Sequence, residues 1–278
     1  MDARFQQNIC LLCERINFHG KIIFAGSHVF GEAGIFSDID CHLVAYSLRE
    51  LFRLVREKET ICHLKQELGI TPSFILSAMP LVRHKLYFVE GWDAQGAWYC
   101  SPYDARLLRN TALKVAYREF FLSRTTAGEA SVYHAGKALL QALWSLAFGK
   151  HIAIPYGVPL FSIRGIREHV LPDMGTDDQI LCQRILCSKL SPKSQISQDD
   201  CAYVFSMIEK AYDCYTKHPF SFRSYILYSI FSLKDGHGSA LFSDPDRKII
   251  RASRKALLSP QAPHSDNIFR QTIPMIII

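Results

Sequence analysis

The chain has 278 residues, of which 49% are hydrophobic and 21% charged, and its formal net charge is +6. This composition excludes a disordered or fibrous protein, and the length suits one large domain or two smaller ones. The positive charge is spread along the chain without a long basic block, which favours a compact anionic ligand over DNA bound non-specifically.

The nine cysteines are odd in number and lie mostly among apolar residues, which is typical of a reducing compartment. The N-terminus lacks the basic flank and apolar run of a signal peptide, and no apolar stretch is as long as a membrane span. We therefore predict a cytoplasmic protein without a membrane partner. Cys10 and Cys13 form a C-x-x-C pair, but apolar residues recur around them at helical spacing, so a position in or beside a helix core is favoured over a metal or redox site.

The first hundred residues alternate between strand and helix patterns. Apolar runs predict strands at residues 21–25, 39–46, 73–79, 85–92 and 97–100. Helices are predicted at residues 3–18 and 47–68, the second beginning at the N-cap Ser47 and ending at Gly69. The last two strands flank a short turn at residues 93–96 and form a predicted hairpin.

From residue 101 the apolar period becomes helical. Ser101 is the predicted cap of the first helix, with Pro102 at the first helical position. Helices are predicted at residues 103–122, 127–148, 162–171, 175–188, 196–217 and 220–233. The sequence thus predicts an α+β protein with a mixed-sheet domain (residues 1–105), an all-helical domain (residues 106–258) and a disordered tail (residues 259–278) with an apolar end.

One stretch, GSHVFGEAGIFSDID at residues 26–40, points to chemistry. Gly26 has no Cβ, so a phosphate can approach the backbone there and accept hydrogen bonds from N–H groups and the Ser27 hydroxyl. Asp38 and Asp40 lie two residues apart on a predicted strand and so on one face, where their charges repel unless a cation lies between them. Carboxylates suit Mg²⁺, or Mn²⁺ in its place, and such an ion bridges to triphosphate oxygens. Taken singly, Asp-x-Asp and Gly-Ser are also common in surface loops.

The segment GSHVFGEAGIFSDIDCHLV resembles the signature of the nucleotidyltransferase superfamily that includes DNA polymerase beta. It is most similar to small bacterial and archaeal members and to aminoglycoside nucleotidyltransferases. The matching positions are Gly26, Ser27, Gly31, Glu32, Ser37, Asp38, Ile39 and Asp40.

This resemblance implies a nucleotidyltransferase fold for residues 1–105 and a helical substrate-binding domain for residues 106–258. The implied reaction moves a nucleoside monophosphate from a nucleoside triphosphate such as ATP to a hydroxyl or similar acceptor, with release of pyrophosphate. Asp38 and Asp40 would bind the metal and act in catalysis, and Gly26, Ser27 and Ser37 would bind the nucleotide. A small molecule, a protein side chain and an RNA end all remain open as acceptors.

Members of this superfamily usually supply a third carboxylate from a neighbouring strand. The run at residues 73–79 has no acid, whereas Glu90 and Asp93 follow in the next strand, three residues apart and so on opposite faces if the strand is regular. Asp93 begins the predicted turn, so Glu90 is the predicted third catalytic residue. A pair of aspartates without a third acid is the alternative, and it would suit a nucleotide-binding regulatory or antitoxin-like protein with little or no turnover.

The helical half offers further candidates. Lys137 is the candidate for binding nucleotide phosphates, although a solvated lysine beside an apolar face is the favoured interpretation of this position. Glu119 and Glu129 are candidate general bases. Arg164 and His169 resemble a motif of helical ribonuclease domains, but a helix places them roughly 140° apart, which favours ordinary charges at a helix end.

Overall fold

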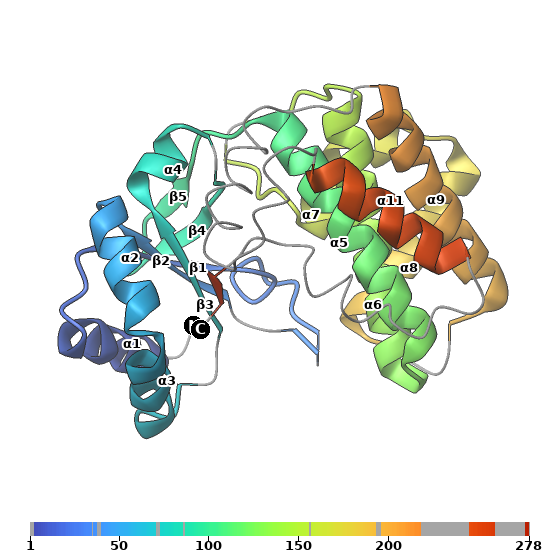
Figure 1. The fold of residues 1–278 in the computed structure, drawn as a ribbon. Coiled ribbons are helices and arrows are strands. Elements are labelled where there is room, and N and C mark those ends of the chain that lie inside the picture. Colours follow the sequence, from blue (N-terminus) through green and yellow to red (C-terminus); the bar gives the residue numbers. More distant parts are fainter. Residues whose placement is uncertain are drawn as a thin grey trace. The chain divides into compact units, whose positions relative to one another are not determined.

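The computed structural model describes residues 3–34, 36–37, 40–70, 73–85, 87–155, 157–192, 196–217, 245–258 and 276–277. The chain is an α+β protein and divides into two compact units (Figure 1). The sheet unit comprises Met1–Ala33, Ser37–Tyr103 and Met275–Ile278, and the helical unit comprises Gly34–Phe36 and Asp104–Pro274.

A mixed sheet forms the centre of the sheet unit. Its described strands are β1 (Gly20–Ala25), β2 (Asp40–Ala45), β3 (Ser73–Ala78), β4 (Glu90–Asp93), β5 (Trp98–Cys100) and β6 (Ile276–Ile277). They are ordered β5-β4-β1-β2-β3-β6, with β2 and β3 parallel and the other neighbours antiparallel. The parallel pair needs a crossover connection. The helices α2 (Leu48–Arg56) and α3 (Lys58–Glu67) provide it.

Both faces of this sheet are packed. The register aligns Phe24, Cys41 and Phe74 across β1, β2 and β3, and all three are fully buried. The helices α1 (Ala3–Arg15), α2 and α3 gather on one side of the sheet (Figure 1). On the other face Ile23 packs with Val89 and with residues that include Met79 of the short helix α4 (Met79–Arg83). Burial on both faces explains the continuous apolar runs of β1 and β3.

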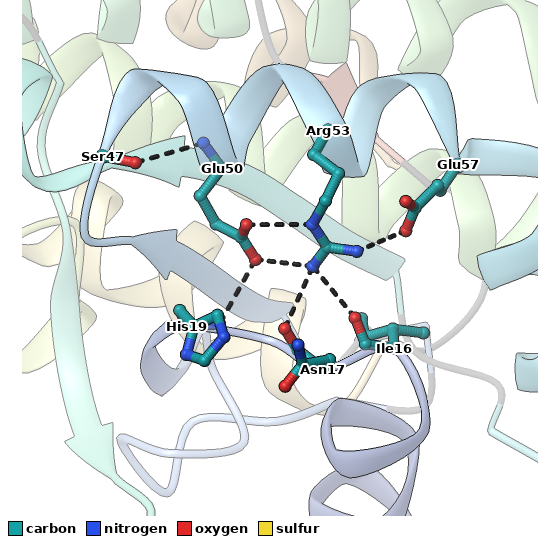
Figure 2. Close-up of polar contacts among 7 residues, drawn as sticks. All are labelled: Ile16, Asn17, His19, Ser47, Glu50, Arg53 and Glu57. Atoms are coloured by element: carbon teal, nitrogen blue, oxygen red, sulfur yellow. Dashed lines mark hydrogen bonds and ion pairs between the residues drawn. The ribbon is translucent and has the colours of Figure 1, made fainter.

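The chain enters β1 through a loop that Arg53 of α2 holds in place (Figure 2). Its Nη2 donates to the carbonyl oxygens of Ile16 at 2.9 Å and Asn17 at 3.1 Å. The same guanidinium pairs with Glu50 at 2.6 Å and Glu57 at 2.5 Å. The hydrogen bond from Arg53 is the main reason why the pKa of Glu50 is lowered. An ion-pair network therefore fixes the start of the strand that leads to the Gly26 turn.

The helical unit is built around one long buried helix. Its described elements are α5 (Ala105–Thr125), α6 (Gly128–Gly149), α7 (Ile163–His169), the 3₁₀ turn η1 (Leu171–Asp173), α8 (Thr176–Leu190), α9 (Gln198–Lys217) and α11 (Pro245–Leu258). Helix α6 packs against α5, α8 and α9, and its Trp144 is fully buried. Helix α11 is attached through Arg254, which binds both carboxylate oxygens of Glu209 at 2.6–3.1 Å, while the Tyr117 hydroxyl donates to Glu209 at 3.0 Å.

Several predicted boundaries need correction. The predicted helix at residues 47–68 is two helices that meet at Glu57, although its cap is confirmed, because Ser47 Oγ accepts from the Glu50 N–H at 3.2 Å. The strand predicted at residues 85–92 is shorter, because Lys85 has φ 58° and only Glu90–Asp93 is extended.

The predicted start of the first helix of the helical unit is wrong. Asp104, not Ser101, is its N-cap and accepts from the Arg106 N–H at 2.9 Å. Ser101 instead accepts from the Val89 N–H at 2.9 Å, and Pro102 lies before the helix.

The C-terminal part also differs from expectation. No pattern predicted α11, and the helix predicted at residues 220–233 lies outside the described residues. Residues 276–277, placed in the predicted disordered tail, pair with β3, and the remainder of that tail lies outside the described residues. In the part of the chain that the structure describes, no helix combines the length and the apolar character needed to cross a membrane.

Candidate functional site

The first strand ends in a glycine turn. Gly26 has φ 85°, a left-handed conformation that residues with a Cβ rarely adopt. The Gly26 carbonyl accepts from the Val29 N–H at 3.1 Å, and the Ser27 carbonyl accepts from the Glu32 N–H at 2.8 Å. These bonds give the turn a defined backbone, and they leave the Ser27 side chain partly exposed.

Asp40 stands at the same edge of the sheet as this turn. It is the first residue of β2 and lies opposite Ala25, the last residue of β1, and opposite Ser73 of β3. Its side chain is half-buried. Asp38 lies outside the described residues, so the structure places one of the two predicted metal ligands.

A hydrogen bond closes the loop between β1 and β2. The Nε2–H of His28 donates to the carbonyl oxygen of Ser37 at 2.8 Å. This bond brings Ser37, a predicted nucleotide ligand, back to the residue that follows the Gly26-Ser27 turn. His28 and Ser37 of the motif therefore meet, although they are nine positions apart in sequence.

The register also brings Glu90 to this edge. Strands β1 and β4 are antiparallel, with Ile23 opposite Asp93 and Phe24 opposite Trp92, so Glu90, the first residue of β4, lies toward the end of β1 that leads to Gly26. The Glu90 side chain is only 6% exposed. Burial raises the pKa of Cys100 to about 11, and the Glu90 charge adds to this effect.

Glu90 and Asp40 can bind one metal ion together only if their side chains reach the same face of the sheet. Residues directly opposite each other on neighbouring strands project to the same face of the sheet, so the side chain of Asp40 lies on the face of Ala25. Trp92 lies opposite Phe24, and therefore on the other face. If β4 alternated regularly, Glu90 would lie on the face of Trp92 and not on that of Asp40. Gly91 interrupts this alternation. Its φ is 151°, and a Cβ there would lie 1.9 Å from the Phe24 carbonyl oxygen. The strand is therefore irregular at the residue that follows Glu90.

Asp93, the other acid of this segment, shapes the hairpin turn. Its Oδ1 accepts from the N–H groups of Gln95 at 3.0 Å and Ala97 at 2.8 Å. It also lies opposite Ile23, two residues from the end of β1. Glu90 is thus the acid of β4 that stands at the edge.

The buried His42 and the half-buried Tyr87 were not singled out from the sequence. His42 lies two residues beyond Asp40 on β2, and its Nδ1 is 3.4 Å from the Tyr87 hydroxyl. Burial lowers the pKa of His42 to about 4, so the imidazole is neutral near pH 7. Burial and, secondarily, the charge of Asp40 raise the pKa of Tyr87. The alternation of β2 could have indicated His42, whereas no local signal indicates Tyr87, which lies 45 residues away.

Lys137 belongs to the helical unit and pairs with a buried acid. Its Nζ is 3.4 Å from Glu119 Oε1, and His134 Nδ1 is 2.7 Å from Glu119 Oε2. Burial opposes ionisation of Glu119, which is 2% exposed, but Lys137 and His134 outweigh that cost and hold its pKa at about 2. A carboxylate with so low a pKa is a weak base, which argues against Glu119 as general base. Glu129 is exposed in the first turn of α6.

The remaining sequence candidates have ordinary surroundings. On α7, Arg164 Nε lies 2.8 Å from Glu168, and His169 Nε2 lies 3.8 Å from the same carboxylate, as expected for charges at a helix end. On α1, burial raises the pKa of Cys13 to about 12, so its thiol is protonated. Among the described residues, which exclude Asp38, no three His, Cys, Asp or Glu side chains gather as a metal site.

The chain was compared with protein-family models, curated proteins and solved structures, and it matches none of them.

Proposed function

We propose that this chain is a Mg²⁺-dependent nucleotidyltransferase that moves a nucleoside monophosphate from a nucleoside triphosphate to an acceptor and releases pyrophosphate. One observation carries this function: the ladders of β1, β2 and β4 bring the Gly26-Ser27 turn, Asp40 and Glu90 to one edge of the sheet. In this proposal the sheet unit has the nucleotidyltransferase fold. The helical unit is the substrate-binding domain.

The donor set suits a hard divalent cation. Carboxylate oxygens are the ligands that Mg²⁺ prefers, and Mn²⁺ accepts the same ligands. Asp40 and its sequence neighbour Asp38 would hold the ion, and Glu90 would complete the set. Bound there, Mg²⁺ would neutralise triphosphate charge during transfer. His42, which is buried two residues from Asp40 on the same strand, is neutral near pH 7 and therefore adds no positive charge there.

The nucleotide would lie against the turn. The backbone N–H groups around Gly26 and the hydroxyls of Ser27 and Ser37 are suitable donors to phosphate oxygens. Lys137 would supply positive charge from the helical unit, where its pairing with Glu119 limits the freedom of the side chain. A hydroxyl of a small molecule, a protein or an RNA end would serve as acceptor.

A nucleotide-binding regulatory or antitoxin-like protein is the second candidate. It is favoured by the alternation of β4, which in regular form gives Glu90 the face opposite Asp40. A site with only two aspartates would still bind a metal-nucleotide complex, but it would stabilise the transition state less. This candidate predicts binding of Mg²⁺-ATP with no release of pyrophosphate.

Transfer of label tests the proposal. The purified chain is incubated with each common nucleoside triphosphate, labelled at the α-phosphate or the γ-phosphate, with Mg²⁺ or Mn²⁺ and a cell extract as the source of acceptors. We expect α-label, but not γ-label, to be attached to an acceptor. Asp40→Asn should lower the rate on the order of a hundredfold or more.

Asp93→Asn is the matched control, because an asparagine Oδ1 can still accept the two turn hydrogen bonds. It should keep normal activity. Transfer that is equal in Asp40→Asn and in the unmodified chain would contradict the proposed site. Binding of Mg²⁺-ATP that depends on Asp40, without pyrophosphate release with any acceptor pool, would support the second candidate instead.

A further inference from the structure

The helical unit contains a pocket of about 460 Å³. This volume falls within the range of roughly 300–1,000 Å³ that is typical of small-molecule sites. The pocket is lined by the C-terminal part of α6, by the segment that leads into α8, and by α9. No residue of the candidate nucleotide site lines it. It is therefore a separate cavity within one unit of the chain.

Part of the lining of this pocket is apolar. Leu146 of α6 is 8% exposed, and Ile152 and Met174 are half-buried, so these side chains keep apolar surface that a ligand can contact. Removing an apolar ligand surface from water against these side chains is favourable. The thioether of Met174 also makes favourable contacts with aromatic rings. These residues suit the ring or chain of an organic ligand.

A carboxylate with a fixed orientation lies beside this apolar surface. Asp178 lines the pocket, is half-buried, and accepts a hydrogen bond from the Tyr203 hydroxyl at 2.9 Å. The same hydroxyl lies 3.3 Å from the Sγ of Cys182, which is fully buried. Tyr203 is thus held between two partners, and it limits the positions that the Asp178 carboxylate can take. A fixed carboxylate is a suitable partner for an ammonium group.

The other charged residues of the pocket lining indicate the net charge of the ligand that the pocket suits best. Asp173 and Asp213 add two exposed carboxylates, whereas Lys150 and Lys210 add two exposed ammonium groups. With Asp178, the described lining residues comprise three acids and two bases, which leaves these residues with an excess of one negative charge. A ligand with one positive charge balances this excess, while a polycation would meet both lysines.

We propose that this pocket binds a small organic monocation, an amine carried on an apolar ring or chain. The ammonium group pairs with Asp178, and the apolar body lies against Leu146, Ile152 and Met174. This binding is independent of nucleotide transfer and goes beyond it.

Three indole compounds with related bodies and different charges test the pocket. Tryptamine is a cation, tryptophol is neutral and indole-3-propionate is an anion at neutral pH. By titration calorimetry on the full chain, we expect tryptamine to bind about tenfold more tightly than tryptophol, because a hydrogen bond to a charged group adds to apolar burial. Indole-3-propionate should bind most weakly, and spermidine should bind more weakly than tryptamine because it lacks an apolar body.

Substitutions assign the binding to Asp178. We expect Asp178→Asn to lower the affinity for tryptamine about tenfold while tryptophol still binds as before. Tyr203→Phe, which keeps the charge and removes the orienting hydroxyl, should give a smaller loss. Asp177→Asn is the matched control, because Asp177 is exposed in the same helical turn and does not line the pocket. It should bind tryptamine normally.

Three results would overturn this assignment. The first is no detectable binding of tryptamine to the unmodified chain. The second is binding of indole-3-propionate or spermidine at least as tight as that of tryptamine. The third is equal loss of tryptamine affinity in Asp178→Asn and Asp177→Asn. The first two comparisons use only the unmodified chain, so they stand even if a variant fails to fold.

Discussion

The two units of the chain place their carboxylates in different electrostatic surroundings. In the helical unit, Glu119 is buried against Lys137 and His134, and Glu209 is bound by Arg254. At the edge of the sheet, burial and, to a smaller extent, the charge of Asp40 raise the pKa of Tyr87. Carboxylates paired with protein cations hold helices together, whereas in the proposed function those at the edge of the sheet would hold a metal ion. We therefore expect substitution of Glu119 to lower the stability of the chain, and substitution of Asp40 to remove ligand binding without lowering stability.

The largest expected loss of stability comes from Glu119→Ala in the helical unit. Removing one partner of a buried ion pair costs about 3–5 kcal/mol, because the remaining charges lose their compensation. Glu119→Gln, which keeps the shape and one hydrogen-bond acceptor, should cost less. Chemical denaturation measures the free energy of unfolding of both variants. A Glu119→Ala protein as stable as the unmodified chain would remove the contrast between the two units.

Acid should weaken the same ion pair. The folded state holds the pKa of Glu119 at about 2, below its ordinary value of 4.5. As the pH falls through this interval, the unfolded chain takes up the proton first, so stability is lost. The loss is on the order of 3 kcal/mol at most. Denaturation curves measured from pH 5 to pH 2 should therefore show Glu119→Gln losing less stability than the unmodified chain. If the two proteins lost the same stability between pH 5 and pH 2, Glu119 would not be the source of the acid sensitivity.

In the sheet unit, Gly91→Ala tests the close approach beside Glu90. A Cβ would collide with the Phe24 carbonyl oxygen in a backbone conformation that alanine rarely adopts, and the expected cost is about 2–3 kcal/mol. Gly96→Ala is the control, because Gly96 also has a positive φ, of 78°, but nothing lies within 4 Å of its added Cβ. It should cost about 1 kcal/mol. Equal melting temperatures for the two variants would show that the approach at Gly91 is not tight.

The smallest of these effects concerns the attachment of α11. Arg254→Met removes the bidentate pair with Glu209, and because both side chains are partly exposed, we expect a loss of roughly 1 kcal/mol. Arg251 lies on the same helix and is exposed, so Arg251→Met should change the melting temperature little. Hydrogen exchange of α11 should be faster only in Arg254→Met. Faster exchange in both variants would mean that general charge, not this pair, holds the helix.

The strands and helices near the site followed from local patterns. An apolar run that ends at Gly26 indicated β1, a second apolar run indicated β2, and the Ser47 cap fixed the start of α2. The position of Gly26 after a buried strand also followed, because the conformation φ 85° calls for glycine. Asp38 is the part of the predicted site that the described residues leave out.

Contacts between distant segments could not be read from the sequence. The Tyr87 hydroxyl reaches His42 of β2 from the segment that precedes β4, and His134 of α6 reaches Glu119 of α5. Ser101 and Asp104 are both good caps, and only the hydrogen bond to the Arg106 N–H distinguishes them. Helix α11 is fastened by Arg254 to a glutamate 45 residues away, so its own sequence carried little of the signal.

Thermal melting of Asp40→Asn with and without Mg²⁺-ATP tests the central claim most directly. If the edge carboxylates serve a metal-bound nucleotide, Mg²⁺-ATP raises the melting temperature of the unmodified chain but not that of Asp40→Asn. The ligand-free variant then melts at the same temperature or slightly higher, since part of the repulsion between Asp38 and Asp40 is removed. A variant that is less stable without ligand, yet gains the same stabilisation from Mg²⁺-ATP, would show that Asp40 is a structural residue.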